Sequence, residues 1–213
     1  MYIIWNTKSN NLNYMLRNYF FINKAVYKLL ILALSMAIIL TTVVKAEEDS
    51  SIDFATDKTV NQYLDKITEI EMTRGPHDEA IEENLISLSG VYKEKGDHLK
   101  RLEVLNQALH LHRINFGLES KEQLGIVEKI ISTNNDLEDW KALDQSYEYL
   151  YWVNRRLYGT DSLELLPTLN RVMEWKLDVI ERGLFGHPEI INHQATDLLR
   201  KIRKVRKINS EES

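Results

Sequence analysis

The chain contains no cysteine among its 213 residues. It therefore cannot rely on disulfide bonds, and it offers neither a thiol nucleophile nor a cysteine-bound metal. Proline is also scarce, with three residues, so little in the sequence interrupts a helix. We expect packing alone to hold the fold.

Acidic residues are absent from the first 46 positions. This segment carries five basic residues: Lys8, Arg17, Lys24, Lys28 and Lys45. Residues 29–44 are uncharged and mostly apolar, and this run is slightly shorter than a typical membrane span. Small side chains stand at Val44 and Ala46, the two positions that a signal peptidase recognises. This order predicts a secretory signal peptide over residues 1–46, cleaved after Ala46.

Two other interpretations of this segment stay open. The 28 residues before the apolar run are long for a signal peptide, which favours an uncleaved signal-anchor unless translation starts at Met15. A buried core helix is the second alternative, although nothing polar interrupts the run. We expect an exported protein, periplasmic or secreted, with membrane anchoring as the alternative, and a disordered acidic linker over residues 47–56.

The remainder of the chain is acidic. Residues 47–213 hold 22 basic and 32 acidic side chains, a balance of −10. They are long enough for one domain. Because like charges repel the phosphate backbone, we expect no nucleic acid among the partners.

Apolar residues recur at helical spacing throughout this part, and no stretch alternates for long like a strand. The stripes comprise Val60, Leu64, Ile67 and Ile70; Ile81, Leu85, Leu88, Val91 and Tyr92; Leu102, Leu105, Leu109 and Leu111; Val127, Ile130 and Ile131; Leu143, Tyr147, Leu150 and Tyr151; Leu169, Val172, Met173 and Leu177; Leu198, Ile202 and Val205. Short breaks such as Gly96-Asp97 force consecutive helices to lie antiparallel. The sequence predicts an all-α fold of about seven helices in hairpin order.

Three glycines, Gly75, Gly117 and Gly159, are spaced by 42 residues. The same spacing relates further positions: Leu85, Val127 and Leu169; Leu88, Ile130 and Val172; Asp97 and Asp139; Arg113 and Arg155; Ser120 and Ser162. A period near 40 with two helices per unit predicts a short α-solenoid, in which each hairpin buries its apolar face against its neighbours.

Residues 85–117, LISLSGVYKEKGDHLKRLEVLNQALHLHRINFG, resemble the 42-residue tetratricopeptide repeat of kinesin light chains and many bacterial proteins. The matching positions are Leu85, Leu88-Ser89, Tyr92, Gly96, Ala108-Leu109 and Phe116-Gly117. The resemblance covers roughly residues 57–182, and we assign residues 57–186 to the repeats. It implies a scaffold or adaptor that binds a protein or peptide.

The later units depart from the family pattern. In the second, Ile131 and Leu150 replace small residues, Asn134 replaces the tyrosine and Glu138 replaces the turn glycine. The third supplies only a first helix convincingly, and residues 57–73 look like an isolated second helix. These departures call the regularity of the superhelix into question more than the helical fold.

No familiar catalytic or metal-binding motif is present. His110 and His112 stand two apart on a helix and so face different ways, and we expect surface or capping roles for all six histidines. We therefore expect neither an enzyme nor a cofactor or metal. A hydrolase is the alternative from another class, and it would need a pocket where two carboxylates, or a histidine and an acid, converge.

In tetratricopeptide arrays the first helix of each hairpin lines the binding groove. By the resemblance, the candidate groove residues are Glu83, Glu94, Glu128, Asp136, Asn170, Glu174 and Asp178. These are mostly acids, so we expect a partner with a cationic segment. An acidic face that binds nothing is the alternative.

The last segment, residues 187–213, reads as a capping helix and tail. Its basic residues are Arg200, Lys201, Arg203, Lys204, Arg206 and Lys207. The helix can cap the last repeat with a solvated basic face, contact anionic lipid, or fold onto the acidic groove of its own or a neighbouring molecule. A homodimer is one expectation, and a membrane-tethered accessory subunit of an envelope complex is the alternative function.

Aromatic residues crowd the second unit. We expect Tyr147, Tyr151 and Tyr158 to fill the core between repeats, and Tyr149 and Trp152 to be the exposed members that could contact a partner.

Overall fold

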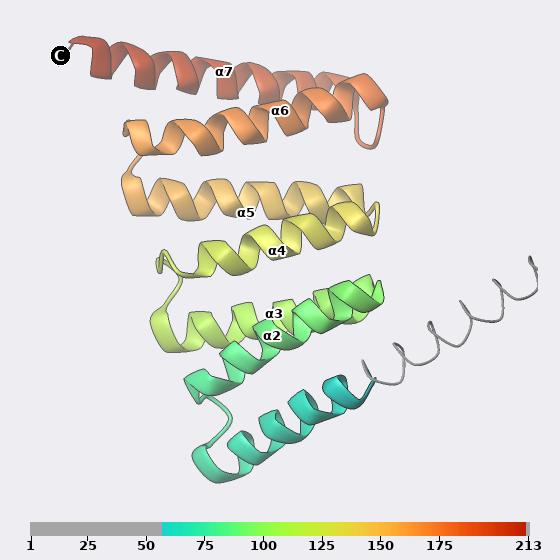
Figure 1. Ribbon diagram of the computed structural model, residues 1–213. Coiled ribbons are helices and arrows are strands. Elements are labelled where there is room, and N and C mark those ends of the chain that lie inside the picture. Colours follow the sequence, from blue (N-terminus) through green and yellow to red (C-terminus); the bar gives the residue numbers. More distant parts are fainter. Residues whose placement is uncertain (1–56, 212–213) are drawn as a thin grey trace, which may run out of the picture. The chain divides into compact units, whose positions relative to one another are not determined.

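The computed structural model describes residues 57–211, in which every regular element is a helix (Figure 1). Helical residues 57–74 are followed by α2 (Glu79–Lys95), α3 (His98–Phe116), α4 (Gln123–Asp136), α5 (Trp140–Tyr158), a short 3-10 helix (Leu163–Leu165), α6 (Leu166–Arg182) and α7 (Pro188–Glu211). The all-α prediction is confirmed. The predicted signal segment (1–46) and acidic linker (47–56) lie outside the described residues.

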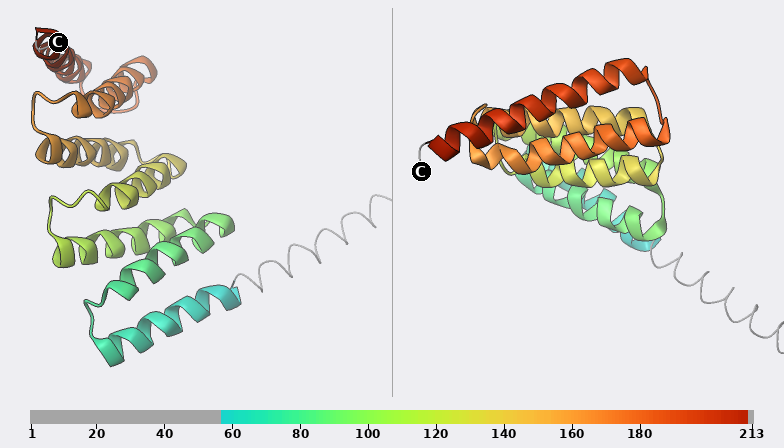
Figure 2. Two further views of the ribbon diagram at one scale, coloured as in Figure 1. Left: turned by 60° about the vertical axis from the view of Figure 1, so that its left-hand side comes forward. Right: turned by 90° about the horizontal axis from the view of Figure 1, so that it is seen from above.

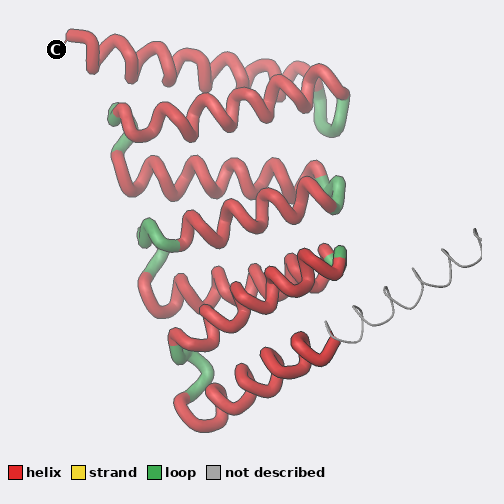
Figure 3. Tube along the Cα trace, viewed as in Figure 1, coloured by secondary structure: helices red, strands yellow, loops and turns green. Residues whose placement is uncertain are grey.

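The helices form antiparallel hairpins, α2 with α3, α4 with α5 and α6 with α7, and each hairpin packs on the next. The connections between them are short (Figure 3). The first helices α4 and α6 run along one side of the stack and the second helices α5 and α7 along the other (Figure 2). We call these the first-helix side and the second-helix side.

The joints between successive hairpins repeat in atomic detail. Gly75, Gly117 and Gly159 all have positive φ, at 101°, 85° and 89°. Each donates its N–H to the carbonyl four residues earlier, at 3.2, 3.0 and 2.9 Å. Two of these glycines have ψ near 180°, a region open essentially to glycine alone, so the 42-residue glycine spacing follows from backbone geometry.

The residue that opens each following helix is also equivalent. Asp78 Oδ1 accepts the N–H two residues on at 2.9 Å, and Ser120 Oγ and Ser162 Oγ do the same at 3.3 and 3.2 Å. These bonds satisfy backbone donors that a helix start leaves without intrahelical partners. One loop therefore occurs three times.

The turns inside the hairpins repeat twice and then change. Gly96 and Glu138 both take positive φ, 73° and 54°, and the aspartates after them cap the second helices. The third turn is longer: α6 continues to Arg182, and the left-handed residue is Gly183. Helix α7 nevertheless completes the third hairpin, where the sequence predicts only a first helix convincingly.

The core follows the 42-residue columns. Leu85, Val127 and Leu169 are all buried. Two predicted stripe residues are exposed instead, Leu64 at 42% and Leu177 at 48%. In α6 the residue that faces the core is Lys176 rather than Leu177, and Lys176 is fully buried. Its equivalents 42 and 84 residues earlier are Asn134 and Tyr92.

Among the described residues, no helix combines the length and the hydropathy needed to cross a membrane. The apolar segment 29–44 is not part of that range.

Candidate functional site

The predicted groove residues all lie on the first helices. Glu83, Glu94, Asp136 and Glu174 are exposed, whereas Glu128, Asn170 and Asp178 are half-buried. They come from α2, α4 and α6, so the structure distributes them along the first-helix side. What this side binds stays a prediction.

Half of the predicted acids are neutralised by cations that the sequence analysis missed. Glu128 Oε1 lies 2.5 Å from Arg171 Nη1, Asp136 Oδ2 lies 3.2 Å from Arg101 Nη1, and Asp178 pairs with Arg182 at 3.0 Å. The hydrogen bond to Glu128 raises the pKa of Arg171 above its usual value.

The arginine on Glu128 comes from another repeat, 43 residues on, which the stripe pattern alone does not reveal. Within residues 57–211, no ion pair involves Glu83, Glu94 or Glu174, and these carry the remaining negative charge of this side.

The first-helix side also carries two glycines inside helices, Gly90 in α2 and Gly125 in α4. Both are accessible at this surface, and a Cβ built on either would meet no atom within 4 Å. Glycine in a helix interior lowers stability relative to alanine. Neither packing nor a positive φ requires glycine at these two positions.

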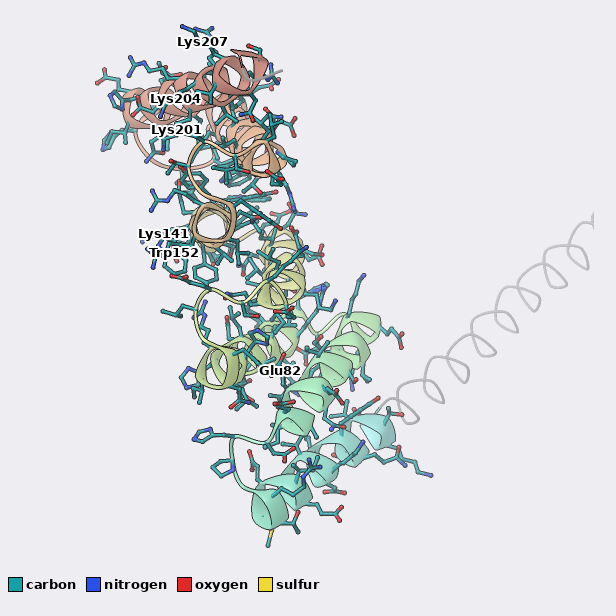
Figure 4. The ribbon with its side chains drawn as sticks, turned by 90° about the vertical axis from the view of Figure 1, so that its left-hand side faces the viewer. Glu82, Lys141, Trp152, Lys201, Lys204 and Lys207 are labelled. Atoms are coloured by element: carbon teal, nitrogen blue, oxygen red, sulfur yellow. The ribbon has the colours of Figure 1, made fainter. Side chains whose placement is uncertain are left out.

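The basic residues of α7 do not share one environment. The stripe Leu198, Ile202 and Val205 is buried against α6. Lys204 Nζ lies 2.9 Å from Asp161 Oδ1, and Lys201 Nζ lies 4.9 Å from the centre of the Tyr151 ring. Both lie on the second-helix side (Figure 4).

All six cations of α7 are exposed, but the remaining four have different neighbours from Lys201 and Lys204. Arg200 pairs with Asp197 on its own helix at 2.8 Å. Arg203 and Arg206 form no ion pair in the described part of the chain, and Lys207 lies near the end of α7. The six predicted contact residues therefore do not form one uniform surface, and lipid binding by α7 stays a prediction.

The aromatic residues of α5 lie in the interfaces between helices. Tyr147 and Tyr151 pack against buried residues from α6 and α7, as expected. Tyr149 was expected to be exposed but is half-buried, because its hydroxyl donates to Gln123 Oε1 at 2.5 Å and accepts from Arg113 Nε at 3.1 Å. Trp152 was also expected to be exposed but is half-buried, and it stacks on Tyr149 at 5.8 Å between ring centres.

His112 is the histidine whose position differs most from expectation, with 2% of its surface exposed. Its Nδ1 lies 2.9 Å from Glu82 Oε1, and its Nε2 lies 2.8 Å from Ser120 Oγ. Glu82 extends from α2 between α2 and α3 (Figure 4). A carboxylate, an imidazole and a hydroxyl in this order are the groups of a hydrolytic triad.

The serine of this trio has an acidic neighbour outside the trio. The Ser120 hydroxyl donates to Glu122 Oε2 at 2.5 Å and accepts the Glu122 N–H. The single proton of the Ser120 hydroxyl is therefore shared between two neighbours, the Glu122 carboxylate and the His112 imidazole. The trio ties α2, α3 and the following joint together.

A buried ion network links α5 to α6. Lys176 Nζ lies 2.7 Å from Asp144 Oδ1 and 2.9 Å from Glu148 Oε1, and Trp175 Nε1 donates to the same Asp144 oxygen at 2.8 Å. The buried ammonium of Lys176 is thus compensated by two carboxylates, of which Glu148 is 50% exposed. Across residues 57–211, no group of three or more histidine and acidic side chains is arranged to hold a metal ion.

No family model matches this chain, and no curated protein matches it either. Among solved structures, the chain is similar to BtubC (BKLC) from P. vanneervenii, with 14% identity and a TM-score of 0.44 over 72% of this chain and 70% of that one. It is also similar to a putative kinesin light chain of Podosopora anserina with nearly identical TPR-like repeats, with 12% identity and a TM-score of 0.44 over 72% and 88% of the two chains.

A substituted form of the latter protein matches over 76% of this chain and 91% of that one, with 12% identity and a TM-score of 0.44. In this chain, helix hairpins stack at a 42-residue period, which is the tetratricopeptide-like repeat arrangement that the resemblance of residues 85–117 implied.

Proposed function

We propose that this protein is a non-catalytic scaffold that binds a partner protein on its first-helix side. The observation that supports the proposal most strongly is the pair of accessible helical glycines, Gly90 and Gly125. A Cβ would fit at either position, so the packing of the fold does not require glycine there. A partner backbone that approaches closely gives these glycines a function.

The position of the contact can be tested with a photo-crosslinking residue. Ser132, exposed on α4, the helix that carries Gly125, is replaced by p-benzoylphenylalanine in the full chain. The matched control carries the same residue at Glu103, exposed on α3. We expect a discrete protein adduct from Ser132 and none from Glu103. Equal adducts from both positions, or none from Ser132, would contradict the proposal.

The charge of the first-helix side bears on the kind of partner. Glu83, Glu94 and Glu174 are exposed and form no ion pair within the described residues. We propose that they favour a cationic segment of the partner. Reversing two of them, with Glu94→Lys and Glu174→Lys, is expected to abolish the Ser132 adduct, and added salt is expected to weaken it. An adduct unaffected by either change would contradict this part of the proposal.

Export is a separate proposal, supported by the basic, apolar and small-residue order of positions 1–46. Its test is the intact mass of the protein recovered from its native cell. Loss of residues 1–46 supports a soluble exported scaffold, whereas the full mass in a membrane fraction supports a tethered accessory subunit. The full mass in the soluble fraction would contradict both.

A further inference from the structure

The groove between neighbouring second helices occurs three times, and its floor differs each time. The floor position comes from the first helix between them and is Tyr92, Asn134 or Lys176. The first groove holds a smaller cavity of about 220 Å³ further along, against Ile81 and Leu85. Tyr92 and the fully buried Lys176 are long side chains, and Lys176 is held by its bonds to Asp144 and Glu148. Asn134 is much shorter, so the middle groove is underfilled.

A cavity of about 340 Å³ lies at this position. Its floor includes Val127, Ile130 and Asn134 of α4, and its walls come from α3 and α5. Because α4 is the floor, the cavity faces the second-helix side, away from the surface proposed above to hold the partner. Trp152, which stacks on the wall residue Tyr149, lies on that same side (Figure 4).

The amide oxygen of Asn134 has no hydrogen-bond partner within the described protein, although the residue is only 2% exposed. Its orientation is fixed. Asn134 Nδ2 donates to Ser146 Oγ at 3.0 Å, and that hydroxyl donates in turn to the Ala142 carbonyl at 2.8 Å. A buried acceptor without a donor is costly, so this oxygen marks a place where the packing of the middle groove is incomplete.

Arg113 supplies a cation at the other end of the cavity. Its guanidinium lies 4.4 Å from the centre of the Tyr149 ring, and its Nε donates to the Tyr149 hydroxyl. Tyr149 is held by Gln123, whose amide nitrogen donates to the carbonyls of Leu118 and Ser120. The arginine is thus oriented before any ligand arrives.

Arg113 forms no ion pair in the part of the chain that the structure describes. By contrast, the buried Arg101 and Lys176 each have a carboxylate partner, at 3.2 and 2.7 Å. With Nε engaged, the two terminal nitrogens of Arg113 are left for a planar anion. The equivalent Arg155 also lies over a tyrosine ring without an ion pair among the described residues, but Arg113 is the one of the two that lines the cavity.

We propose that this cavity binds an extended peptide segment of a partner protein through one Asp or Glu side chain. The carboxylate pairs with Arg113, and an adjacent apolar side chain of the peptide enters the cavity above Val127 and Ile130. Along α3, the wall from Asn106 to Arg113 spans about 10 Å at 1.5 Å per residue. Three extended residues span the same length.

The binding test uses an array of N-acetylated, C-amidated hexapeptides, each with one Asp or Glu and with an Asn or Gln counterpart as its pair. The full chain is expected to bind a subset of the acidic peptides at least about ten-fold more tightly than their amide counterparts. Arg113→Gln is expected to remove that difference. The matched control is Arg155→Gln, the equivalent arginine one repeat on, which lies over Tyr151 and does not line the cavity.

A second variant separates binding from folding. Asn134→Tyr places in the middle groove the residue that Tyr92 provides in the first, and it is expected to fill the cavity and abolish peptide binding while the helical circular dichroism and Tm are retained. If Asn134→Tyr folds and still binds, or if Arg113→Gln leaves the preference for acidic peptides unchanged, the proposal is wrong. An array without any acidic preference also overturns it. Because the cavity faces the second-helix side, none of these outcomes affects the crosslinking test at Ser132.

Discussion

Gly117 and Gly159, 42 residues apart, have nearly the same backbone conformation, φ 85° with ψ 176° and φ 89° with ψ 169°. Each donates its N–H to the carbonyl of an equivalent arginine, Arg113 or Arg155. The repeat therefore extends to single hydrogen bonds. Every residue in a repeated position has an equivalent in a neighbouring hairpin, and that equivalent provides a natural control.

The first prediction concerns these joints. Gly117→Ala is expected to lower the free energy of unfolding by about 1–3 kcal/mol, because a Cβ is poorly tolerated at this φ and ψ although nothing in space obstructs it. Urea unfolding followed by circular dichroism measures the change. Gly183→Ala is the control, since φ 61° with ψ 39° is a left-handed conformation that other residues can adopt. A smaller loss at Gly117 than at Gly183 would contradict the argument.

The second prediction concerns the hairpin turns. Glu138 has φ 54° where the preceding repeat has Gly96 at φ 73°. Glu138→Gly is expected to raise the free energy of unfolding by about 0.5 kcal/mol, because the relief of left-handed strain exceeds the entropy that glycine loses on folding. Gly96→Ala is expected to lower it by about 1 kcal/mol. Thermal unfolding measures the change in Tm, which is expected to rise for Glu138→Gly and to fall for Gly96→Ala. A change of Tm in the same direction for both variants would contradict the equivalence of the turns.

The third prediction concerns the buried cation. Lys176→Met is expected to cost about 3 kcal/mol of unfolding free energy, because Asp144 is then left partly buried without its cation. Adding Asp144→Leu removes that unpaired charge and is expected to restore part of the loss. Chemical denaturation of the single and double variants measures both steps. A double variant less stable than Lys176→Met would mean that the carboxylate, rather than the ion pair, stabilises the α5–α6 interface.

The fourth prediction concerns the helical glycine at the proposed binding surface. Gly90→Ala is expected to raise the unfolding free energy by about 0.5–1 kcal/mol, because alanine favours the helix and its Cβ meets no neighbour. The same change is expected to reduce the crosslinked adduct from Ser132. Glu103→Ala, at an exposed position on α3, serves as the control for binding. A more stable protein whose adduct is unchanged would show that Gly90 does not contact the partner.

The fifth prediction concerns pH. The Ser120 hydroxyl and then the backbone N–H lower the pKa of Glu122 below its usual 4.5, and Ser162 does the same for Glu164. A lowered pKa in the folded protein means that the unfolded state binds more protons. The stability that these groups contribute is therefore present above pH 4.5 and is lost as the pH falls through the folded pKa.

Carboxyl carbon shifts in an NMR titration measure this effect. Ser120→Ala and Ser162→Ala are expected to return the pKa of Glu122 and Glu164 towards 4.5. Ser132→Ala is expected to leave both unchanged. If the serine variants titrate like the unaltered protein, the hydroxyls are not the cause of the lowered pKa values.

Much of the fold was predictable because its signals are local. Each helix is indicated by its apolar spacing, its capping residues and the glycines at positive φ, all of which depend on neighbours within a few residues. Because these features recur every 42 residues, each occurrence supports the prediction made from the others. Leu64 and Leu177 were misassigned for the same reason. An apolar residue at helical spacing is buried only if another helix covers it, and spacing does not say which helices do so.

The candidate sites depended on side chains from different repeats. Arg171 reaches Glu128 and neutralises part of the predicted acidic groove, and the burial of His112 and Lys176 follows from acids supplied by neighbouring helices. Such pairings require the crossing of two helices, which no periodicity specifies.

By itself, then, the sequence determined an all-α stack of hairpins with a 42-residue period, because backbone conformation and hydrophobic spacing are local properties. Only the tertiary structure decided which charges compensate each other and that the short Asn134 leaves a cavity beside Arg113, which has no ion pair within the described residues. These outcomes depend on the space between helices, and that space is defined once the hairpins have packed.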